Sequence, residues 1–324
     1  MALHCTINLV LLIFAINAAV TYATKFDYVI VGGGTCGLLV ANRLSEDPNI
    51  TVAVIEPGPD VRDNVNVTDA GNFLVAYDTP IDWAYPSVPQ PGAANRSLTF
   101  HSGKAIGGSS TINGMTYIRA DEAEIDAWET LGNEGWNWET LFPYYKKVEK
   151  FIRPTAAQEA AGASYEPEYH GEHGDMLVGF RYALPNGSFH DIVQETWENT
   201  GYPTNPDVNS GATRGFDVWP QTIDRELDMR WDAARAYYYP VEGRANLRIL
   251  KGTGIRIVWD TRDSSGGKLA RGVEYVNSNQ TTVIAVGKEV ILSAGSLRTP
   301  LLLERSGIGN NQWVLWTSSV LLGF

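Results

Sequence analysis

Two short apolar runs rich in β-branched residues lie near the start of the chain, at residues 25–31 and 51–55. Runs of this kind predict strands that are buried on both faces. Between them, the glycines of 32–37 predict a tight turn and residues 38–44 have a helix-favouring composition. Glu56 follows the second run directly. The order strand, glycine turn, helix, strand and acid predicts a βαβ unit, and therefore an α/β fold with a Rossmann-type domain.

The rest of the chain gives a coarser pattern. Residues 57–100 are loop-like, and 153–225 are mixed and rich in turns. Helices are predicted at 121–131, 140–151 and 229–239, and strands at 247–250, 255–259, 272–276, 281–285 and 289–293. The length of 324 residues favours about two domains.

The N-terminus predicts a processing signal. Residues 7–20 are apolar apart from two asparagines, which is short of the roughly 20 residues that span a membrane. Small residues stand at positions 21 and 23, so we expect a signal peptide over 1–23, cleavage after Ala23 and no stable membrane span afterwards. A membrane-anchored N-terminus is the alternative, because the leader lacks Lys and Arg.

Five glycosylation sequons agree with export. Their acceptors are Asn49, Asn66, Asn95, Asn186 and Asn279. We therefore expect a secreted, extracellular glycoprotein. Cys36 would be the single cysteine after cleavage, so no internal disulfide is expected.

Composition narrows the function classes. The chain is 44% hydrophobic and 19% charged, which is typical of a packed globular protein. Its net charge of −12 would repel a phosphate backbone, so we expect no nucleic-acid partner.

The glycine turn has the spacing of a dinucleotide-binding fingerprint. Gly32, Gly34 and Gly37 allow a tight turn and a close approach of a pyrophosphate to the helix N-terminus. Glu56, 19 residues further on, is placed to accept the hydroxyls of a ribose and would repel a 2′-phosphate. This motif leaves FAD and NAD open, and its simpler interpretation is a glycine turn followed by a solvated glutamate.

Two further stretches decide between these cofactors. Residues 103–120 read GKAIGGSSTINGMTYIRA, and residues 294–309 read AGSLRTPLLLERSGIG. Shorter matches lie between them, at 133–138, 170–171 and 230–236. With these motifs the chain resembles the glucose–methanol–choline (GMC) oxidoreductases, which use FAD, and most of all their fungal glucose-oxidase-like branch.

The resemblance implies roles for particular residues. Thr35 and Cys36 would meet the pyrophosphate, and the backbone of Ile255 would meet the adenine. Ser109, Asn113, Gly114 and Thr116 would line the flavin and its phosphates. Some relatives attach FAD through a histidine where this chain has Ile112, so we expect non-covalent FAD. Tyr169 replaces a disulfide cysteine of the glucose-oxidase branch, which argues against close identity with glucose oxidase itself.

The resemblance also implies a domain plan and a reaction. Residues 24–120 and 225–309 would form a discontinuous FAD-binding domain, 121–224 a partial lid or substrate-side segment, and 310–324 an atypical tail. The family oxidises alcohols, such as sugars or aryl and aliphatic alcohols, by hydride transfer to flavin N5, with oxygen or another acceptor.

The family's base histidine lies beyond the match to residue 309, so we expect a C-terminally truncated, inactive chain with no catalytic residue of its own. A non-catalytic secreted flavin-binding glycoprotein or a remnant is the alternative, and a natural short form and an NAD dehydrogenase are weaker ones. The oligomeric state stays open.

The histidines predict no metal site. His170 and His173 are separated by a glycine and a glutamate, and no third ligand is evident nearby. His101 is expected to pack beside the flavin loop, and His190 has no partner that the sequence indicates.

Overall fold

The computed structural model describes residues 22–181, 184, 187–260 and 267–310. Its strands are β1 (Tyr22–Val31), β2 (Val52–Glu56), β3 (Tyr85–Pro86), β4 (Thr99–Phe100), β5 (Glu149–Ile152), β6 (Met176–Gly179), β7 (Ile223–Asp224), β8 (Met229–Arg230), β9 (Leu247–Lys251), β10 (Thr253–Asp260), β11 (Leu269–Asn277) and β12 (Gln280–Leu292). Its α-helices are α1 (Thr35–Leu44), α2 (Val65–Thr68), α3 (Glu122–Thr130), α4 (Trp138–Val148), α5 (Ala156–Ala160), α6 (Ser188–Asn199), α7 (Ala233–Tyr237) and α8 (Gly295–Arg305). Short 3₁₀ turns, among them η3 (Gly108–Thr111), connect several of them.

The central sheet has six strands in the order β10-β11-β12-β1-β2-β9. Strand β1 pairs in parallel with β12 on one side and with β2 on the other, and β2 pairs in parallel with β9. Strands β10, β11 and β12 form an antiparallel meander at the opposite edge. The predicted α/β class and Rossmann-type βαβ unit are therefore confirmed, with α1 as the crossover between β1 and β2.

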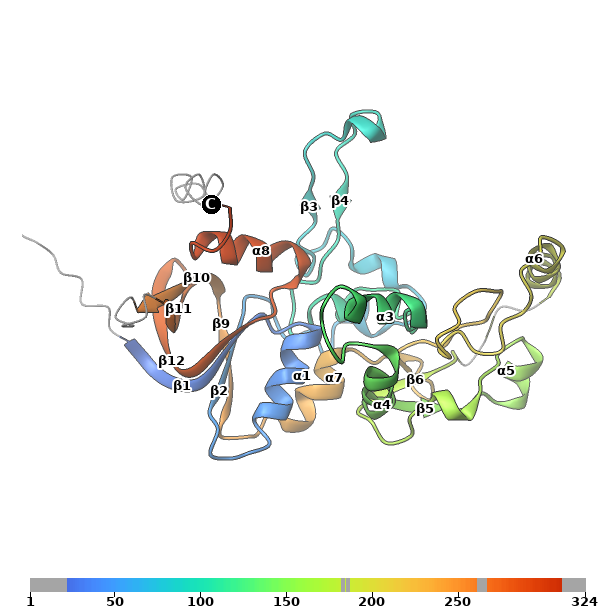
Figure 1. Ribbon diagram of the computed structural model, residues 1–324, viewed down its shortest axis with the longest axis horizontal. Coiled ribbons are helices and arrows are strands. Elements are labelled where there is room, and N and C mark those ends of the chain that lie inside the picture. The colour runs from blue at the N-terminus through green and yellow to red at the C-terminus, as the bar shows by residue number, and fades with distance from the viewer. Residues whose placement is uncertain (1–21, 182–183, 185–186, 261–266, 311–324) are drawn as a thin grey trace, which may run out of the picture.

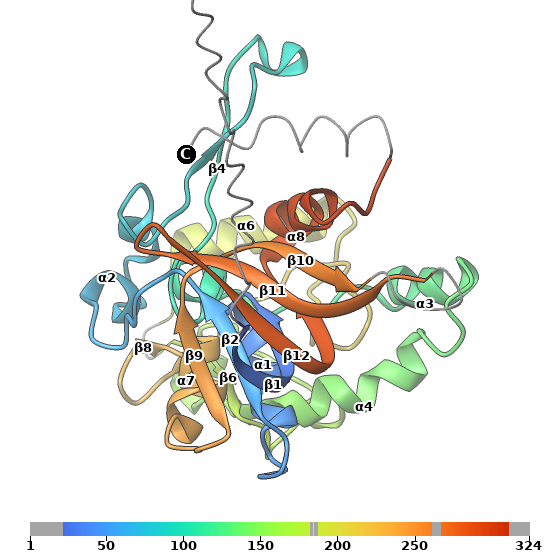
Figure 2. The same ribbon diagram turned by 90° about the vertical axis from the view of Figure 1, so that its left-hand side faces the viewer.

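The sheet is buried on both faces because its strands carry apolar residues at successive positions. Ile30, Val52 and Val54 face α1, where Ala41 packs against them. Alternate residues such as Val29 face the other side, where Leu302 of α8 packs. Figures 1 and 2 show α8 on one side of the sheet and α1 with α7 on the other. This two-sided cover explains why the two runs lack the polar alternation of a solvated strand.

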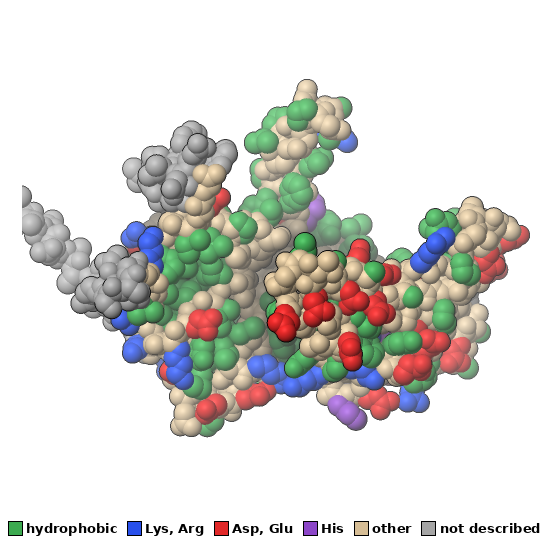
Figure 3. Space-filling model, in the orientation of Figure 1, with side chains coloured by type: hydrophobic (Ala, Val, Ile, Leu, Met, Phe, Trp, Pro, Cys, Tyr) green, Lys and Arg blue, Asp and Glu red, His purple; other side chains and the backbone are tan. Residues whose placement is uncertain are grey.

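A second lobe contains α3, α4, α5 and α6, to the right of the sheet in Figure 1. It is not independent of the first. One buried cluster joins Leu38 of α1 and Ala234 of α7 to Phe151 and Val178, which lie on the parallel pair β5–β6. Acidic side chains gather over α3 (Figure 3), in keeping with the net negative charge.

Two strands, β3 and β4, form the base of a hairpin that projects away from the body, at the top of Figure 1. Its apolar residues Val88, Leu98 and Phe100 are exposed. Among the described residues, no helix has both the length and the apolar content that crossing a membrane requires.

The predicted glycosylation acceptors lie on turns and short elements. Asn49, Asn95 and Asn279 are exposed and Asn66 on α2 is half-buried, whereas Asn186 lies outside the described residues. Most of the predicted signal peptide and nearly all of the predicted tail also lie outside them, although β1 already begins at Tyr22.

Several predicted elements were wrong in extent. The two strands predicted at 281–285 and 289–293 are one strand, β12, which ends at Leu292. It continues through Gly287 because β1 pairs along it with two register shifts. The helix predicted at 229–239 is reduced to α7, since Met229 and Arg230 pair with β7 and Asp232 caps the helix. The helix predicted at 140–151 ends at Val148, where β5 begins and pairs with β6.

Candidate functional site

A cavity of about 530 Å³ opens at the carboxyl ends of β1 and β12. Its lining comes from the glycine turn, the first turn of α1, the end of β2, η3, the start of β10 and the first turns of α8. In parallel sheets this edge, just beyond the strands, is where ligands bind. The cavity is large enough for a sizeable small molecule or a part of a dinucleotide.

The glycines keep this edge closely packed. Gly32 has φ +107, and a Cβ atom there would lie 2.3 Å from the carbonyl oxygen of Ser293. A Cβ atom on Gly37 would lie 2.0 Å from the carbonyl oxygen of Gly32. Gly108, at φ +56, approaches Gly34 so closely that its Cβ atom would lie 2.6 Å from the Cα of Gly34. Glycine at these positions therefore lets β1, α1, α8 and η3 meet.

The N-termini of two helices reach the cavity. Gly34, Thr35 and Cys36 line it from the first turn of α1, and Gly295 and Ser296 line it from the first turn of α8. Neither helix has a side-chain N-cap or an acidic residue in its first turn. The free N–H groups and the positive ends of both helix dipoles are thus left for an anion. This arrangement fits the pyrophosphate of a dinucleotide.

Glu56 lies at the end of β2 and is buried, with 6% of its surface exposed. Its carboxylate accepts hydrogen bonds from the N–H groups of Gly33 at 2.9 Å and Gly58 at 2.8 Å. Burial raises the pKa of Glu56, although these two N–H groups act in the opposite direction. Each carboxylate oxygen has a further lone pair, so Glu56 can hold the glycine turn and still accept a ribose hydroxyl.

Seven of the eleven predicted cofactor residues line the cavity: Gly32, Gly34, Thr35, Cys36, Glu56, Ser109 and Ile255. Ser109 Oγ accepts a hydrogen bond from the N–H of Gly103 at 3.1 Å and lies 3.3 Å from Ser102 Oγ. Both neighbours line the cavity as well, so this wall is polar.

The other four predicted residues do not line it. Gly37 supports the turn from behind, as its close approach to Gly32 shows. Asn113, Gly114 and Thr116 belong to a stretch that is fixed elsewhere: Arg230 donates to Asn113 Oδ1 at 2.8 Å, and Gln221 donates to the carbonyl oxygen of Gly114 at 3.2 Å.

Arg230 is the largest fully buried side chain of the described residues. Besides Asn113, it binds the carbonyl oxygens of Val67 and Ser110 and so ties three segments together. Burial lowers the pKa of Arg230 to about 10. The described residues supply no hydrogen-bond acceptor for its Nη2 atom.

Sequence reasoning missed one wall of the cavity. Trp83 and Arg298 line it, and the guanidinium carbon of Arg298 lies 3.7 Å from the centre of the Trp83 ring. Arg298 lies within the 294–309 stretch, but the resemblance assigned it no role. Trp83 lies in the loop-like region 57–100, and no local signal in the sequence links the two residues. The ammonium group of Lys104 lies 4.6 Å from the same ring.

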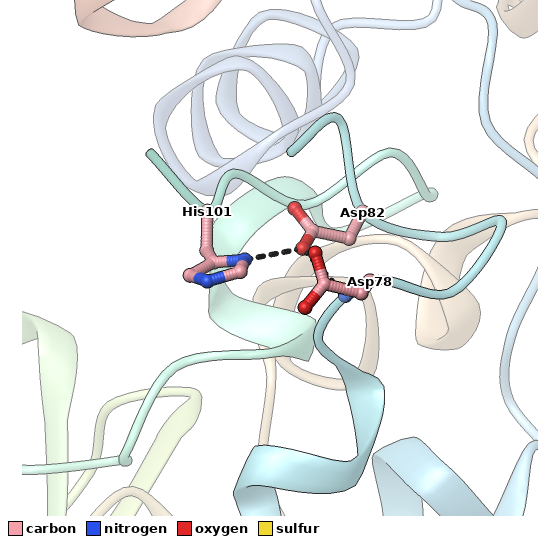
Figure 4. Close-up of side chains that lie close together, drawn as sticks. All are labelled: Asp78, Asp82 and His101. Carbon is pink, nitrogen blue, oxygen red and sulfur yellow. Dashed lines mark hydrogen bonds and ion pairs between the residues drawn. The ribbon is translucent and has the colours of Figure 1, made fainter. Parts of the chain in front are cut away.

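His101 forms a hydrogen-bonded cluster with two acids (Figure 4). Its Nδ1 lies 2.5 Å from Asp82 Oδ2, and its ring stacks on Tyr77 at 4.0 Å. Asp78, Asp82 and His101 offer ligand atoms within 4.8 Å of one another. However, Asp82 also accepts from the N–H groups of Asp78, Ala84 and Ser102, so its oxygens are already occupied. The cluster therefore organises the loops before the glycine-rich segment.

His170 is buried between two carboxylates. Its Nδ1 lies 2.8 Å from Glu149 and its Nε2 lies 2.9 Å from Asp207. Glu149 also receives a hydrogen bond from Arg119 at 2.8 Å. Both carboxylates can be satisfied only by the imidazolium form, because neutral imidazole has a single N–H. His170 thus forms structural ion pairs with Glu149 and Asp207, and it lies apart from the cavity.

The remaining described histidines also lie away from the cavity. His173 is exposed, and His190 packs against Phe216 with its ring centre at 5.3 Å. The expectation that His190 lacks a partner was incomplete, since its Nδ1 lies 3.5 Å from Asp191.

Comparisons with known proteins give a consistent result. Residues 26–315 match the family described as GMC oxidoreductase. The chain is 57% identical to glucose oxidase-like protein fsoC of Humicola fuscoatra, over 85% of this chain and 47% of that protein. It is 39% identical to glucose oxidase of Penicillium chrysogenum, over 88% of this chain and 47% of that one.

A solved structure agrees with these relatives. The FAD-dependent oxidoreductase of Chaetomium thermophilum superposes with a TM-score of 0.82 at 33% identity, over 89% of this chain and 48% of that one. The chain spans about half the length of these relatives.

Proposed function

Since the chain belongs to the GMC oxidoreductase family, we propose that its cavity holds the adenosine and pyrophosphate part of FAD and that it serves the oxidation of an alcohol. One observation carries the proposal: two uncapped helix N-termini and the buried carboxylate of Glu56 meet around a single cavity at the carboxyl edge of the sheet. A diphosphate joined to a ribose matches this combination of N–H donors and one acceptor.

The chain's residues take distinct roles in this proposal. The N–H groups of the first turns of α1 and α8 bind the pyrophosphate, and Glu56 accepts the ribose hydroxyls. Ile255, near the start of β10, and its neighbours enclose the adenine. Ser109 contributes a hydroxyl to the same cavity. When bound, FAD supplies the acceptor for the hydride that leaves the alcohol carbon.

FAD is held without a covalent bond in this proposal. Ile112, at the position that bears a histidine in relatives with attached flavin, has no nucleophilic atom. Its side chain is 2% exposed and packs with Val67, Ala76 and Ile81. Asn113, Gly114 and Thr116 follow it, and we propose that they face the flavin end beyond the described cavity.

The proposed substrate class is a CH–OH donor, such as a sugar, because the relatives include proteins named glucose oxidase. We further propose that residues 24–120 and 225–309 form the cofactor domain and 121–224 the substrate side. The described histidines are engaged elsewhere or lie away from the cavity. We therefore infer that this chain alone binds FAD without turning over an alcohol.

Export and glycosylation complete the proposal. They are supported by the exposure of the acceptors Asn49, Asn95 and Asn279. Produced in a eukaryotic secretory host, the protein should begin near Thr24 and lose mass on glycosidase treatment. An intracellular product of unmodified mass would contradict this.

A reconstitution experiment tests the proposed function. The purified chain is mixed with FAD, passed through a desalting column and examined by flavin absorbance before and after acid precipitation. We expect flavin to co-elute with the protein and to leave the pellet on precipitation. Hydrogen peroxide is then measured with glucose and aryl alcohols, and with a version extended by the C-terminal half of a relative. Absence of bound flavin would refute the cofactor role, and FAD-dependent turnover by the chain alone would refute its inactivity.

A further inference from the structure

Arg298 joins two parts of the chain at the cavity wall. It lies on α8, and its Nε atom donates a hydrogen bond to the hydroxyl of Tyr85 at 2.5 Å, across a separation of 213 residues. Its guanidinium also lies over the ring of Trp83 at 3.7 Å. A stacked cation and a directed hydrogen bond act on the same short segment, residues 83–85.

The segment that Arg298 holds has an unusual backbone. Ala84 has φ 42, a left-handed conformation that non-glycine residues rarely adopt. The rings of Trp83 and Tyr85, on either side of Ala84, stack with centres 5.8 Å apart and planes 12° apart. Trp83, just before β3, and Tyr85, its first residue, both contact the guanidinium group of Arg298. Strain of this kind persists where surrounding contacts fix it, and it gathers at functional sites.

Arg298 also brings charge to the cavity. It lines the cavity together with Trp83 and Glu56. Its charge, like that of Lys104, is close enough to Glu56 to oppose the rise in that carboxyl's pKa that burial causes. The wall beside Glu56 therefore combines an indole ring with positive charge, as suits an anionic nucleotide.

We propose that Arg298 is a positioning residue for the adenosine diphosphate half of FAD. Its contacts with Trp83 and Tyr85 hold residues 83–85 against α8, and we call these two contacts the latch. FAD dissociates only when the latch is broken. The inference rests on the proposed function, because it takes FAD as the occupant of the cavity. It assigns a role to a side chain of the 294–309 stretch to which the resemblance gave none.

The test measures retention of the cofactor. The chain is loaded with FAD, and release is followed by the recovery of flavin fluorescence after dilution. Affinity for ADP, which carries only the adenosine half, is measured separately. Arg298→Ala should release FAD about tenfold faster or more and weaken ADP binding by a similar factor. Arg298→Lys should recover part of this loss, since an ammonium can still lie over Trp83.

A second variant and a control separate the latch from a general loss of charge or fold. Tyr85→Phe removes only the acceptor hydroxyl and should release FAD a few-fold faster. Arg96→Ala removes a cation from the same hairpin, where its Nε binds the carbonyl oxygen of Ala93, and should change release by less than about twofold.

The outcomes are distinguishable. If the unaltered chain retains no FAD, the proposed function and the latch are both refuted. If it retains FAD but Arg298→Ala and Tyr85→Phe release it at the same rate as the unaltered chain, only the latch is refuted. Faster FAD release with unchanged ADP affinity would refute the placement of the latch at the adenosine half.

Discussion

Replacing Gly37 by alanine should destabilise the fold itself. A Cβ atom at this position would lie 2.0 Å from the carbonyl oxygen of Gly32, 3.1 Å from its carbonyl carbon and 3.3 Å from Ser293 Cβ. The first two contacts are with backbone atoms, so no side-chain rotation can relieve them. Helix α1 would have to move away from β1 by about an ångström, against the tight packing of the interior.

The magnitude follows from this geometry. Overpacking of an interior site usually costs about 1–3 kcal/mol, and a backbone contact belongs at the upper end. For a chain of 324 residues, a loss of about 3 kcal/mol corresponds to a fall in Tm of roughly 4–6 °C.

Gly34→Ala is the matched control, because it adds the same methyl group three residues earlier. Gly34 has φ −89 and ψ −161, which alanine adopts, and its Cβ atom would lie 3.6 Å from the nearest heavy atom, Gly108 Cα. The stability of the cofactor-free protein should therefore change by less than about 1 kcal/mol. Gly34 lines the cavity at the N-terminus of α1, however, so the methyl group should lower FAD affinity at least about tenfold.

Two measurements check this pair. Thermal unfolding of the cofactor-free proteins, followed by circular dichroism, gives the stability change, and titration with FAD gives the affinity. We expect Gly37→Ala to lower Tm and Gly34→Ala to lower affinity at nearly unchanged Tm. A Gly37→Ala protein that unfolds within about 2 °C of the unaltered chain would refute the packing argument. A Gly34→Ala protein with full FAD affinity would refute the position of the pyrophosphate.

Three further predictions use other parts of the structure. Glu56→Ala should weaken FAD binding by about tenfold to a hundredfold, because a hydrogen bond to a charged group contributes about 1.5–3 kcal/mol; fluorescence titration measures this, and unchanged affinity would contradict it. Saturating FAD should slow the alkylation of exposed Cys36 by maleimide several-fold, as judged by mass spectrometry, whereas an equal rate would place the cofactor elsewhere. Burial lowers the pKa of His170, but the hydrogen bonds of this side chain to Asp207 and Glu149 outweigh burial and raise the pKa above 6.5. The stability that charged His170 adds is therefore complete below about pH 6.5 and is lost as the pH rises through the raised pKa. Urea unfolding between about pH 5 and about pH 9 should show this decline, and His170→Gln should remove it while lowering stability at about pH 5 by roughly 3 kcal/mol.

The sequence was informative where local residues determine the structure. The βαβ unit was predicted because β1 and β2 contain short apolar runs and the glycines between them indicate a tight turn before a helix. Seven predicted cofactor residues line the cavity for the same reason, since most of them follow one another along this unit.

Elements that depend on distant partners were missed. Helix α8 contains Pro300, which argues against a helix in the sequence. Helix α6 has only four apolar residues, and three of them, Phe189, Ile192 and Trp197, are exposed. We predicted two strands in place of β12 because Gly287 interrupts the apolar run, and only the pairing with β1 makes the strand continuous. The wall formed by Trp83 and Arg298 depends on a contact across the whole domain, which no local pattern encodes.

The cavity therefore depends on one long-range pairing. Ser293, just after β12, donates its N–H to the carbonyl oxygen of Val31 at 2.8 Å, and its own carbonyl oxygen lies where a side chain on Gly32 would be. This contact places the N-terminus of α8 beside that of α1, although the two helices are about 260 residues apart in the sequence. Residues up to 120 include the glycine turn and the N-terminus of α1, which is only one of the two helix N-termini left for the anion. The glycine turn and the stretch 294–309 form one site because the parallel pairing of β1 and β12 brings the carboxyl ends of these strands together.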